Sequence, residues 1–161
     1  MPVLYVTEGG ETTKIAQSPS VCSPSLRHVF SRSLKRRHSQ IMRYAGKLTG
    51  LYPEDPLEAA LVDQIVDGAN DCTAKVMAAG KEGGAEVVAE WLDFYEKLLV
   101  AKGGSFFNGK SLSIAELTVT TMMGFLGRMA GDMSAVPHVK GMVDATNALP
   151  AVAEWNAKAA L

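Results

Sequence analysis

Cysteines and long hydrophobic runs are both scarce in this sequence of 161 residues. The two cysteines, Cys22 and Cys72, are too few for the disulfide network of a small secreted domain, so we expect a cytoplasmic protein. A membrane helix needs about 20 consecutive apolar residues. The longest candidate, residues 117–126, is shorter and includes three threonines. We therefore expect no membrane-spanning segment.

Patterns typical of metal or nucleic-acid binding are missing as well. His28, His38 and His138 do not have the spacing of metal ligands, so no metal site is predicted. The basic run at residues 34–38 could contact nucleic acid, but no motif of a nucleic-acid-binding fold accompanies it. We therefore do not expect nucleic acid as a partner, and deletion of residues 19–39 would test that role.

Acidic residues are absent from residues 19–39, although this segment holds five of the 16 basic residues. The rest of the chain has 11 basic residues against 17 acidic ones, so the segment differs from its surroundings in charge. It also contains six serines and two prolines and shows no sustained period. These features predict a loop or a disordered segment.

Short β-rich runs precede this segment. Residues 2–6 predict a strand that leads into a turn at Gly9 and Gly10, and residues 12–18 could form the returning strand. A lone hairpin is at best marginally stable in water, so this one needs a larger sheet to join.

Helical periodicity begins near residue 40. A short helix starts at Ile41 and ends at Gly50. A second helix starts at Asp55 and Pro56, where Asp55 suits a helix cap and Pro56 the first helical position, and it runs to Gly80. A third spans residues 85–102, before two glycines. Apolar residues recur at three- and four-residue spacing along the second and third helices, namely Leu61, Ile65, Ala69, Cys72 and Val76, then Val88, Trp91, Leu92, Tyr95, Leu98 and Leu99.

The clearest local signal is the Ser-x-x-Glu pattern formed by Ser113 and Glu116, which predicts a capping box that opens a helix to about Ala130. That helix is almost wholly apolar or small, so we expect it at the centre of a bundle. Pro137 and Pro150 then stand at the first positions of two short helices. The fold class is therefore mainly α, with helices that pack as a bundle.

Five patterns stand in order along the chain: Gly50-Leu51-Tyr52-Pro53, residues 58–63, Asp67-Gly68 with Asp71, the capping segment at residues 107–116, and Pro150-x-Val152-x-x-Trp155. Taken in this order, they resemble the cytosolic glutathione transferases, near the alpha, pi and sigma classes. Glu116 stands where the family normally has Asp. The resemblance implies a C-terminal-type helical bundle, with the N-terminal hairpin as a remnant of a thioredoxin-like domain.

The resemblance also divides the chain. Residues 1–18 resemble strands three and four of the thioredoxin-like domain, with Pro2 at its cis-proline. Residues 40–161 resemble the last helix of that domain followed by the all-α domain, and residues 19–39 interrupt the match. We hypothesise that residues 19–39 are translated intron and that Met1 is a mis-assigned start.

In the resembling family, a glutathione thiolate attacks a hydrophobic electrophile, which serves detoxification, and homodimers form through the helix at residues 56–79. A free thiol has a pKa near ~8.5, so the anion needs a donor that stabilises it. The family's donor lies in a part that the resemblance does not match, so no catalytic residue is assigned. No cofactor is implied, because glutathione is a co-substrate.

Five residues match the family's glutathione contacts. Met1 and Pro2 would contact the cysteinyl part, Gln17 and Ser18 would bind the γ-glutamyl end at a helix N-terminus, and Asp71 would reach the amino group across the dimer. Asp63, Asp67 and Asp71 also share one helix face, so Asp71 could instead belong to a solvated acidic face or an interface ion pair.

A non-enzymatic alternative stays open. The same helical domain serves as a docking piece in translation factors and synthetase complexes, so this chain could be a protein-interaction module.

Overall fold

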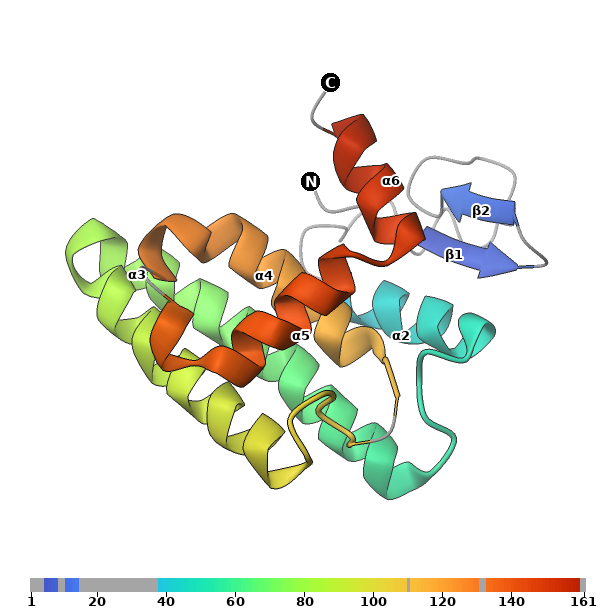
Figure 1. The fold of residues 1–161 in the computed structure, drawn as a ribbon, viewed down its shortest axis with the longest axis horizontal. Helices are drawn as coiled ribbons and strands as arrows, with labels where there is room; N and C mark the ends of the chain where they lie inside the picture. Colours follow the sequence, from blue (N-terminus) through green and yellow to red (C-terminus); the bar gives the residue numbers. More distant parts are fainter. Residues whose placement is uncertain (1–4, 9–10, 15–37, 110, 131–132, 160–161) are drawn as a thin grey trace. The chain divides into compact units, whose positions relative to one another are not determined.

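The computed structural model describes residues 5–8, 11–14, 38–109, 111–130 and 133–159 (Figure 1). It divides into two compact units, Met1–Tyr52 and Pro53–Leu161. Most of the predicted insert, and with it Cys22 and His28, lies outside the described residues.

The first unit holds an antiparallel hairpin of β1 (Tyr5–Glu8) and β2 (Glu11–Lys14). Its register pairs Tyr5 with Lys14 and Glu8 with Glu11, so the strands pair up to the residues that flank Gly9 and Gly10. The predicted hairpin is confirmed, but its inner bounds differ, because β1 extends to Glu8 and β2 begins at Glu11. The outer bounds stay predictions, since residues 2–4 and 15–18 lie outside the described residues.

Helix α2 (His38–Thr49) follows in the same unit. It begins at His38, three residues before the predicted start and inside the range predicted as insert. Gly50, with φ 71°, ends it as predicted, because an L-residue with a side chain rarely adopts this backbone conformation.

The second unit begins with α3 (Pro56–Ala101), which is two helices joined at Gly80. Gly80 has φ 67° and ψ −160°, and the chain reverses there so that the two halves of α3 lie side by side (Figure 1). Asp55 caps the first half, and Gly103 and Gly104, with φ 98° and 89°, follow the second. The predicted break at Gly80 and the predicted ends are confirmed.

Three more α-helices complete the described part of this unit: α4 (Ile114–Ala130), α5 (Pro137–Asn147) and α6 (Pro150–Ala159). A 3-10 turn, η2 (Met133–Ala135), precedes α5. Pro137 and Pro150 are first helical residues, as predicted. Because α3, α4 and α5 all contact one another, their shared interior forms the core of the bundle.

The core includes most of the predicted apolar positions, but Leu61, Trp91 and Leu98 are only half-buried, and Val62 and Val66, which were not predicted, are buried. Fully or nearly fully buried side chains come from both halves of α3, from α4 and from α5; they include Val62, Val66, Cys72, Val76, Val88, Tyr95, Leu99, Val119, Met122, Leu126 and Val139. Burial of one such aliphatic side chain contributes about 1.5–3 kcal/mol. The expectation that α4 is buried on all sides was wrong for Phe125, which is 67% exposed. Within this unit α4 packs on α3 and α5, and Phe125 lies on the exposed side of α4 together with Thr121 and Gly124.

Candidate functional site

Of the five residues predicted to contact glutathione, the structure describes only Asp71. Met1, Pro2, Gln17 and Ser18 lie outside the described residues, so the set stays a prediction. Asp71 is exposed on the first half of α3, as is Asp67, while Asp63 is half-buried on the same helix. An exposed carboxylate at this position can accept hydrogen bonds from an ammonium group without first displacing a packed side chain.

Next to Asp71, the interior between the two halves of α3 holds Cys72 and Tyr95. Burial raises the pKa of the Cys72 thiol to about 11, although the nearby Lys75 ammonium acts in the opposite direction. Burial, and then the proximity of Cys72 and Asp71, raises the pKa of the Tyr95 hydroxyl. Both groups therefore stay protonated at neutral pH, and neither is a nucleophile or a general base there.

Gly68 explains why the Asp67-Gly68 pattern needs a glycine. A Cβ at position 68 would lie 2.8 Å from the Trp91 ring, and that ring packs at 5.8 Å from the Tyr95 ring. The Lys75 ammonium lies 5.6 Å from the centre of the Trp91 ring. Gly68 thus leaves room for the Trp91 ring of the second half of α3.

The predicted capping box at the start of α4 is confirmed, and it is completely buried. The Glu116 carboxylate accepts hydrogen bonds from the Ser113 backbone N–H and hydroxyl, both at 2.7 Å. The Ser113 hydroxyl oxygen in turn accepts from the Ala115 N–H at 3.1 Å. Glu116 also accepts from the Phe107 N–H at 2.8 Å, so the same side chain fixes the preceding loop.

A second side-chain cap, which is partly buried, was missed by the sequence analysis. Val136 precedes α5 and provides no side-chain cap, and Glu96 of α3 takes that role. Its carboxylate accepts from the His138 and Val139 N–H groups at 3.1 and 3.0 Å, and it lies 2.6 Å from His138 Nδ1. No local signal could have found this contact, because the partners are 42 and 43 residues apart.

His138 also accounts for one of the glycines that end α3. A Cβ on Gly104 would lie 2.7 Å from the His138 ring. The ring, Glu96 and the Gly104 backbone thus form one packed contact between α3 and α5. The role of His138 in this contact is therefore to hold α5 against α3 and the residues that follow it.

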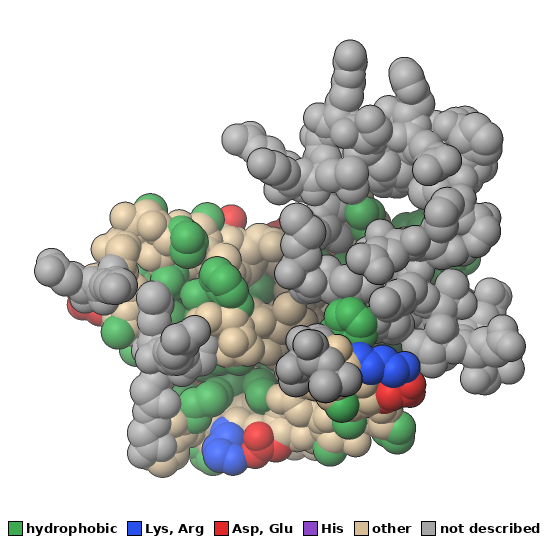
Figure 2. Space-filling view, turned by 90° about the horizontal axis from the view of Figure 1, so that it is seen from above, with side chains coloured by type: hydrophobic (Ala, Val, Ile, Leu, Met, Phe, Trp, Pro, Cys, Tyr) green, Lys and Arg blue, Asp and Glu red, His purple; other side chains and the backbone are tan. Residues whose placement is uncertain are grey.

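Among the described residues, no group of three or more His, Cys, Asp or Glu side chains is placed to hold a metal ion. None of the described helices is both long and apolar enough to cross a membrane. On the described part of the face in Figure 2, basic and acidic side chains lie beside one another and form no patch of one sign.

The sequence matches the profile of the family "Glutathione S-transferase, C-terminal domain" over residues 68–159, which is more than half of the chain. The chain belongs to the glutathione S-transferase family. The matched range includes Asp71, the Ser113–Glu116 cap and the Pro150–Trp155 pattern, so the resemblance drawn from these residues is confirmed at the level of the family.

Known glutathione S-transferases agree with this assignment. Glutathione S-transferase 1 of Ascaris suum is 29% identical over 134 residues, which cover 73% of this chain and 65% of that protein. Human glutathione S-transferase P is 30% identical over 120 residues, which cover 68% of this chain and 57% of that protein. The chain thus spans less than two thirds of the length of these relatives.

The fold is that of solved members of the family. A monomeric glutathione S-transferase from the hookworm Necator americanus superposes with a TM-score of 0.65 at 22% identity. The superposition covers 74% of this chain and 66% of the hookworm protein. At this identity the likeness establishes the fold alone, and it confirms the predicted C-terminal-type helical bundle.

Proposed function

We propose that this protein is glutathione transferase-like: it binds glutathione, and its helical unit forms the side of the site that holds a hydrophobic electrophile. The observation that carries the proposal is the family match over residues 68–159, which coincides with a helical unit whose buried Ser113–Glu116 cap is intact. The predicted contacts at Met1, Pro2, Gln17, Ser18 and Asp71 belong to this proposal. So does a cytoplasmic location.

Asp71 makes the proposal testable with a single substitution. Its carboxylate is exposed, and we propose that it pairs with the glutathione amino group. Removal of one exposed charge–charge contact costs up to about 1 kcal/mol, or roughly fivefold in affinity. Asp144 offers a matched control, because it is an exposed aspartate on α5 that pairs with Lys140 in the same helix.

Retention on glutathione–agarose is the first test. The full chain should be retained and should elute with free glutathione. Asp71→Asn should elute at a lower glutathione concentration, whereas Asp144→Asn should behave like the unchanged chain. Failure of the full chain to bind, or equal weakening by both substitutions, would contradict glutathione binding through Asp71.

We also propose that two copies of the chain form a homodimer through the first half of α3. Leu57 and Met77 are exposed near the two ends of that half, and a second copy would cover them. Because the hookworm protein is monomeric, the oligomeric state needs its own measurement. Sedimentation equilibrium should show a dimer that Met77→Lys weakens, and a monomer at all concentrations would overturn this part.

Conjugating activity of the 161-residue chain should be low, because no residue of this chain matches the family's thiolate donor. A conjugation assay with 1-chloro-2,4-dinitrobenzene should give rates close to the uncatalysed reaction, and rates typical of the family would contradict this. The exposed apolar side chains on α3 and α4 also suit the alternative, a protein-interaction module. Stable capture of a protein partner, together with no retention by glutathione, would favour that alternative.

A further inference from the structure

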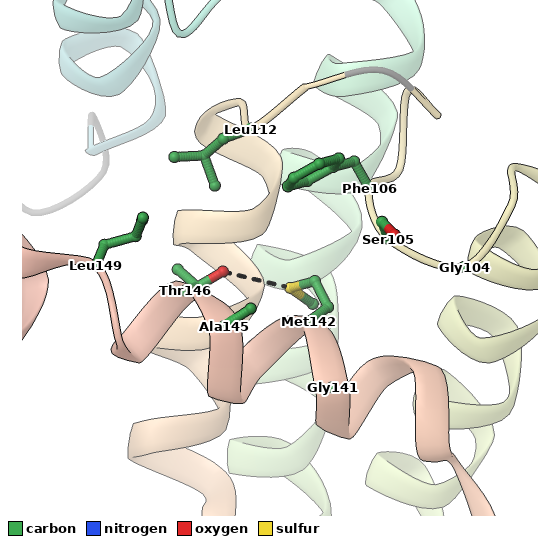
Figure 3. A pocket seen from close by; sticks show the side chains of 9 residues that line it. All are labelled: Gly104, Ser105, Phe106, Leu112, Gly141, Met142, Ala145, Thr146 and Leu149. Atoms are coloured by element: carbon green, nitrogen blue, oxygen red, sulfur yellow. Dashed lines mark hydrogen bonds between the residues drawn. The ribbon is translucent and has the colours of Figure 1, made fainter.

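A groove with a volume of about 420 Å³ lies between α5 and the segment that joins α3 to α4 (Figure 3). Phe106 and Leu112 line it from the segment, and Met142 and Leu149 line it from α5 and the residues after it. None of its nine lining residues is charged. Its volume falls in the range of small-molecule sites, which is about 300–1,000 Å³.

Small residues keep the groove open along α5. Gly141 and Ala145 both line it, and they are one helical turn apart. A Cβ placed on Gly141 would meet no atom within 4 Å. Gly141 and Ala145 are both exposed, so this side of the groove is open to solvent.

Thr146 is a buried polar residue that lines the groove, and its hydroxyl has only a weak hydrogen-bond acceptor. The Thr146 side chain is 3% exposed, and its hydroxyl donates to the Met142 sulfur at 3.8 Å. The buried Thr120 hydroxyl donates to the same sulfur at 3.9 Å. A thioether sulfur is a weak acceptor. Two buried hydroxyls therefore share one weak acceptor, and Figure 3 shows the Thr146 hydroxyl at the side of the groove.

We propose that this groove binds a small, uncharged, mainly apolar molecule that carries one hydrogen-bond acceptor, such as an aryl ketone. The apolar walls would cover its rings, and its carbonyl oxygen would accept the Thr146 proton in place of the sulfur. A charged ligand is disfavoured, because no lining side chain would offset the loss of its hydration. The proposal does not rest on glutathione binding, since Asp71 does not line the groove.

Methyl NMR of the full chain with ¹³C-methyl methionine tests the proposal without glutathione. Benzophenone is the probe, and diphenylmethane is its match without the carbonyl oxygen; the Met142 signal is assigned from the spectrum of Met142→Leu. Benzophenone should shift the Met142 signal saturably and bind roughly three- to tenfold more tightly than diphenylmethane, which is the value of one hydrogen bond. Thr146→Val should remove that difference.

Variants that fill the groove with a larger side chain provide a second test of the proposal. Gly141→Leu should abolish the shift at Met142, and Ala145→Leu replaces it if that variant does not fold. Gly124→Leu is the control, because Gly124 lies on α4 and a Cβ there also meets nothing within 4 Å.

Three results would overturn the proposal. They are no saturable shift at Met142, equal affinity for the two probes, and full binding by the filled variants. A Met142 shift that depends on protein concentration alone would overturn it too, because it would assign the groove to a second copy of the chain.

Discussion

The starts of α3 and α4 carry the same kind of cap in the sequence but differ in the structure. Asp55 is exposed, and its side chain accepts from the Leu57 and Glu58 N–H groups at 3.0 and 2.9 Å, both within the first turn. Glu116 is 0% exposed, and it accepts from Ser113 and also from Phe107, nine residues earlier.

This difference shows that two properties of a cap decide what it stabilises: how deeply its side chain is buried, and how far away in sequence its hydrogen-bond partners are. Water can replace an exposed acceptor such as Asp55, so its loss affects one helix end. It cannot replace Glu116, whose loss would leave buried donors at Ser113 and Phe107 without partners. Glu96 is 15% exposed and so less buried than Glu116, but it caps a helix that is remote from it in sequence.

Substitution of the buried cap should have the largest effect. Glu116→Ala should lower the free energy of unfolding by about 3–5 kcal/mol, because it removes a buried acceptor of three hydrogen bonds. Urea unfolding followed by circular dichroism measures the loss. Glu116→Asp, which keeps the carboxylate, should lose less; a loss below about 1 kcal/mol for Glu116→Ala would break the comparison.

Substitution of the remote cap should have an intermediate and pH-dependent effect. Glu96→Gln should cost about 1–2 kcal/mol at pH 7. Burial alone would raise the pKa of Glu96, but hydrogen bonds from Val139 and His138 outweigh it and hold that pKa below its ordinary value of 4.5. The carboxylate therefore stabilises the fold above pH 4.5, and this contribution is lost as the pH falls through the lowered value.

Unfolding curves from pH 7 down to pH 3 test this sign. The curves of the unchanged chain and Glu96→Gln should converge at the acidic end. Glu90→Gln, an exposed substitution on the same helix, is the control and should show no such convergence. A gap between the unchanged chain and Glu96→Gln that widens as the pH falls would contradict the assignment.

The exposed cap should matter less. Asp55→Ala should lower the free energy of unfolding by about 1 kcal/mol, the usual value for an N-cap residue. Asp55→Asn keeps an acceptor and should lose only a few tenths of that. Thermal unfolding of the two variants side by side measures the difference. If Asp55→Ala lost as much free energy of unfolding as Glu116→Ala, burial would not determine how much a cap contributes.

Removal of the unsatisfied hydroxyl should have the smallest effect. The Tyr95 hydroxyl has no hydrogen-bond partner among the described residues, while its ring packs at 5.5 Å from that of Phe107. Tyr95→Phe keeps the ring and removes the orphan group, so the free energy of unfolding should stay unchanged or rise by up to about 1 kcal/mol. A clear loss, measured in urea, would mean that the hydroxyl has a partner.

Local signals account for most of what the sequence could predict of the fold. Gly80, Gly103, Pro137 and Pro150 mark helix boundaries because their backbone chemistry acts within a few residues. Periodicity identified most of the buried face of α3 for the same reason, whereas α4 was predicted to be buried on all sides. The exposure of Phe125 was missed, because it depends on which helices pack around α4.

Long-range contacts set the limit for the candidate site. The Glu96–His138 contact joins residues from two helices, and neither helix alone indicates it. The groove that Thr146 lines is formed by residues from two segments that are distant in sequence, so neither segment alone predicts it. Of the glutathione set, only Asp71 lies within the described residues, so that part of the site still rests on the family resemblance.

Calorimetric titration of the folded 161-residue chain with glutathione tests the central claim most directly. Saturable heat that Asp71→Asn weakens roughly fivefold, and that Asp144→Asn leaves unchanged, is the predicted result. A chain that keeps its helical circular dichroism spectrum but shows no binding heat at any accessible glutathione concentration would contradict the proposed function, although the family fold would stand.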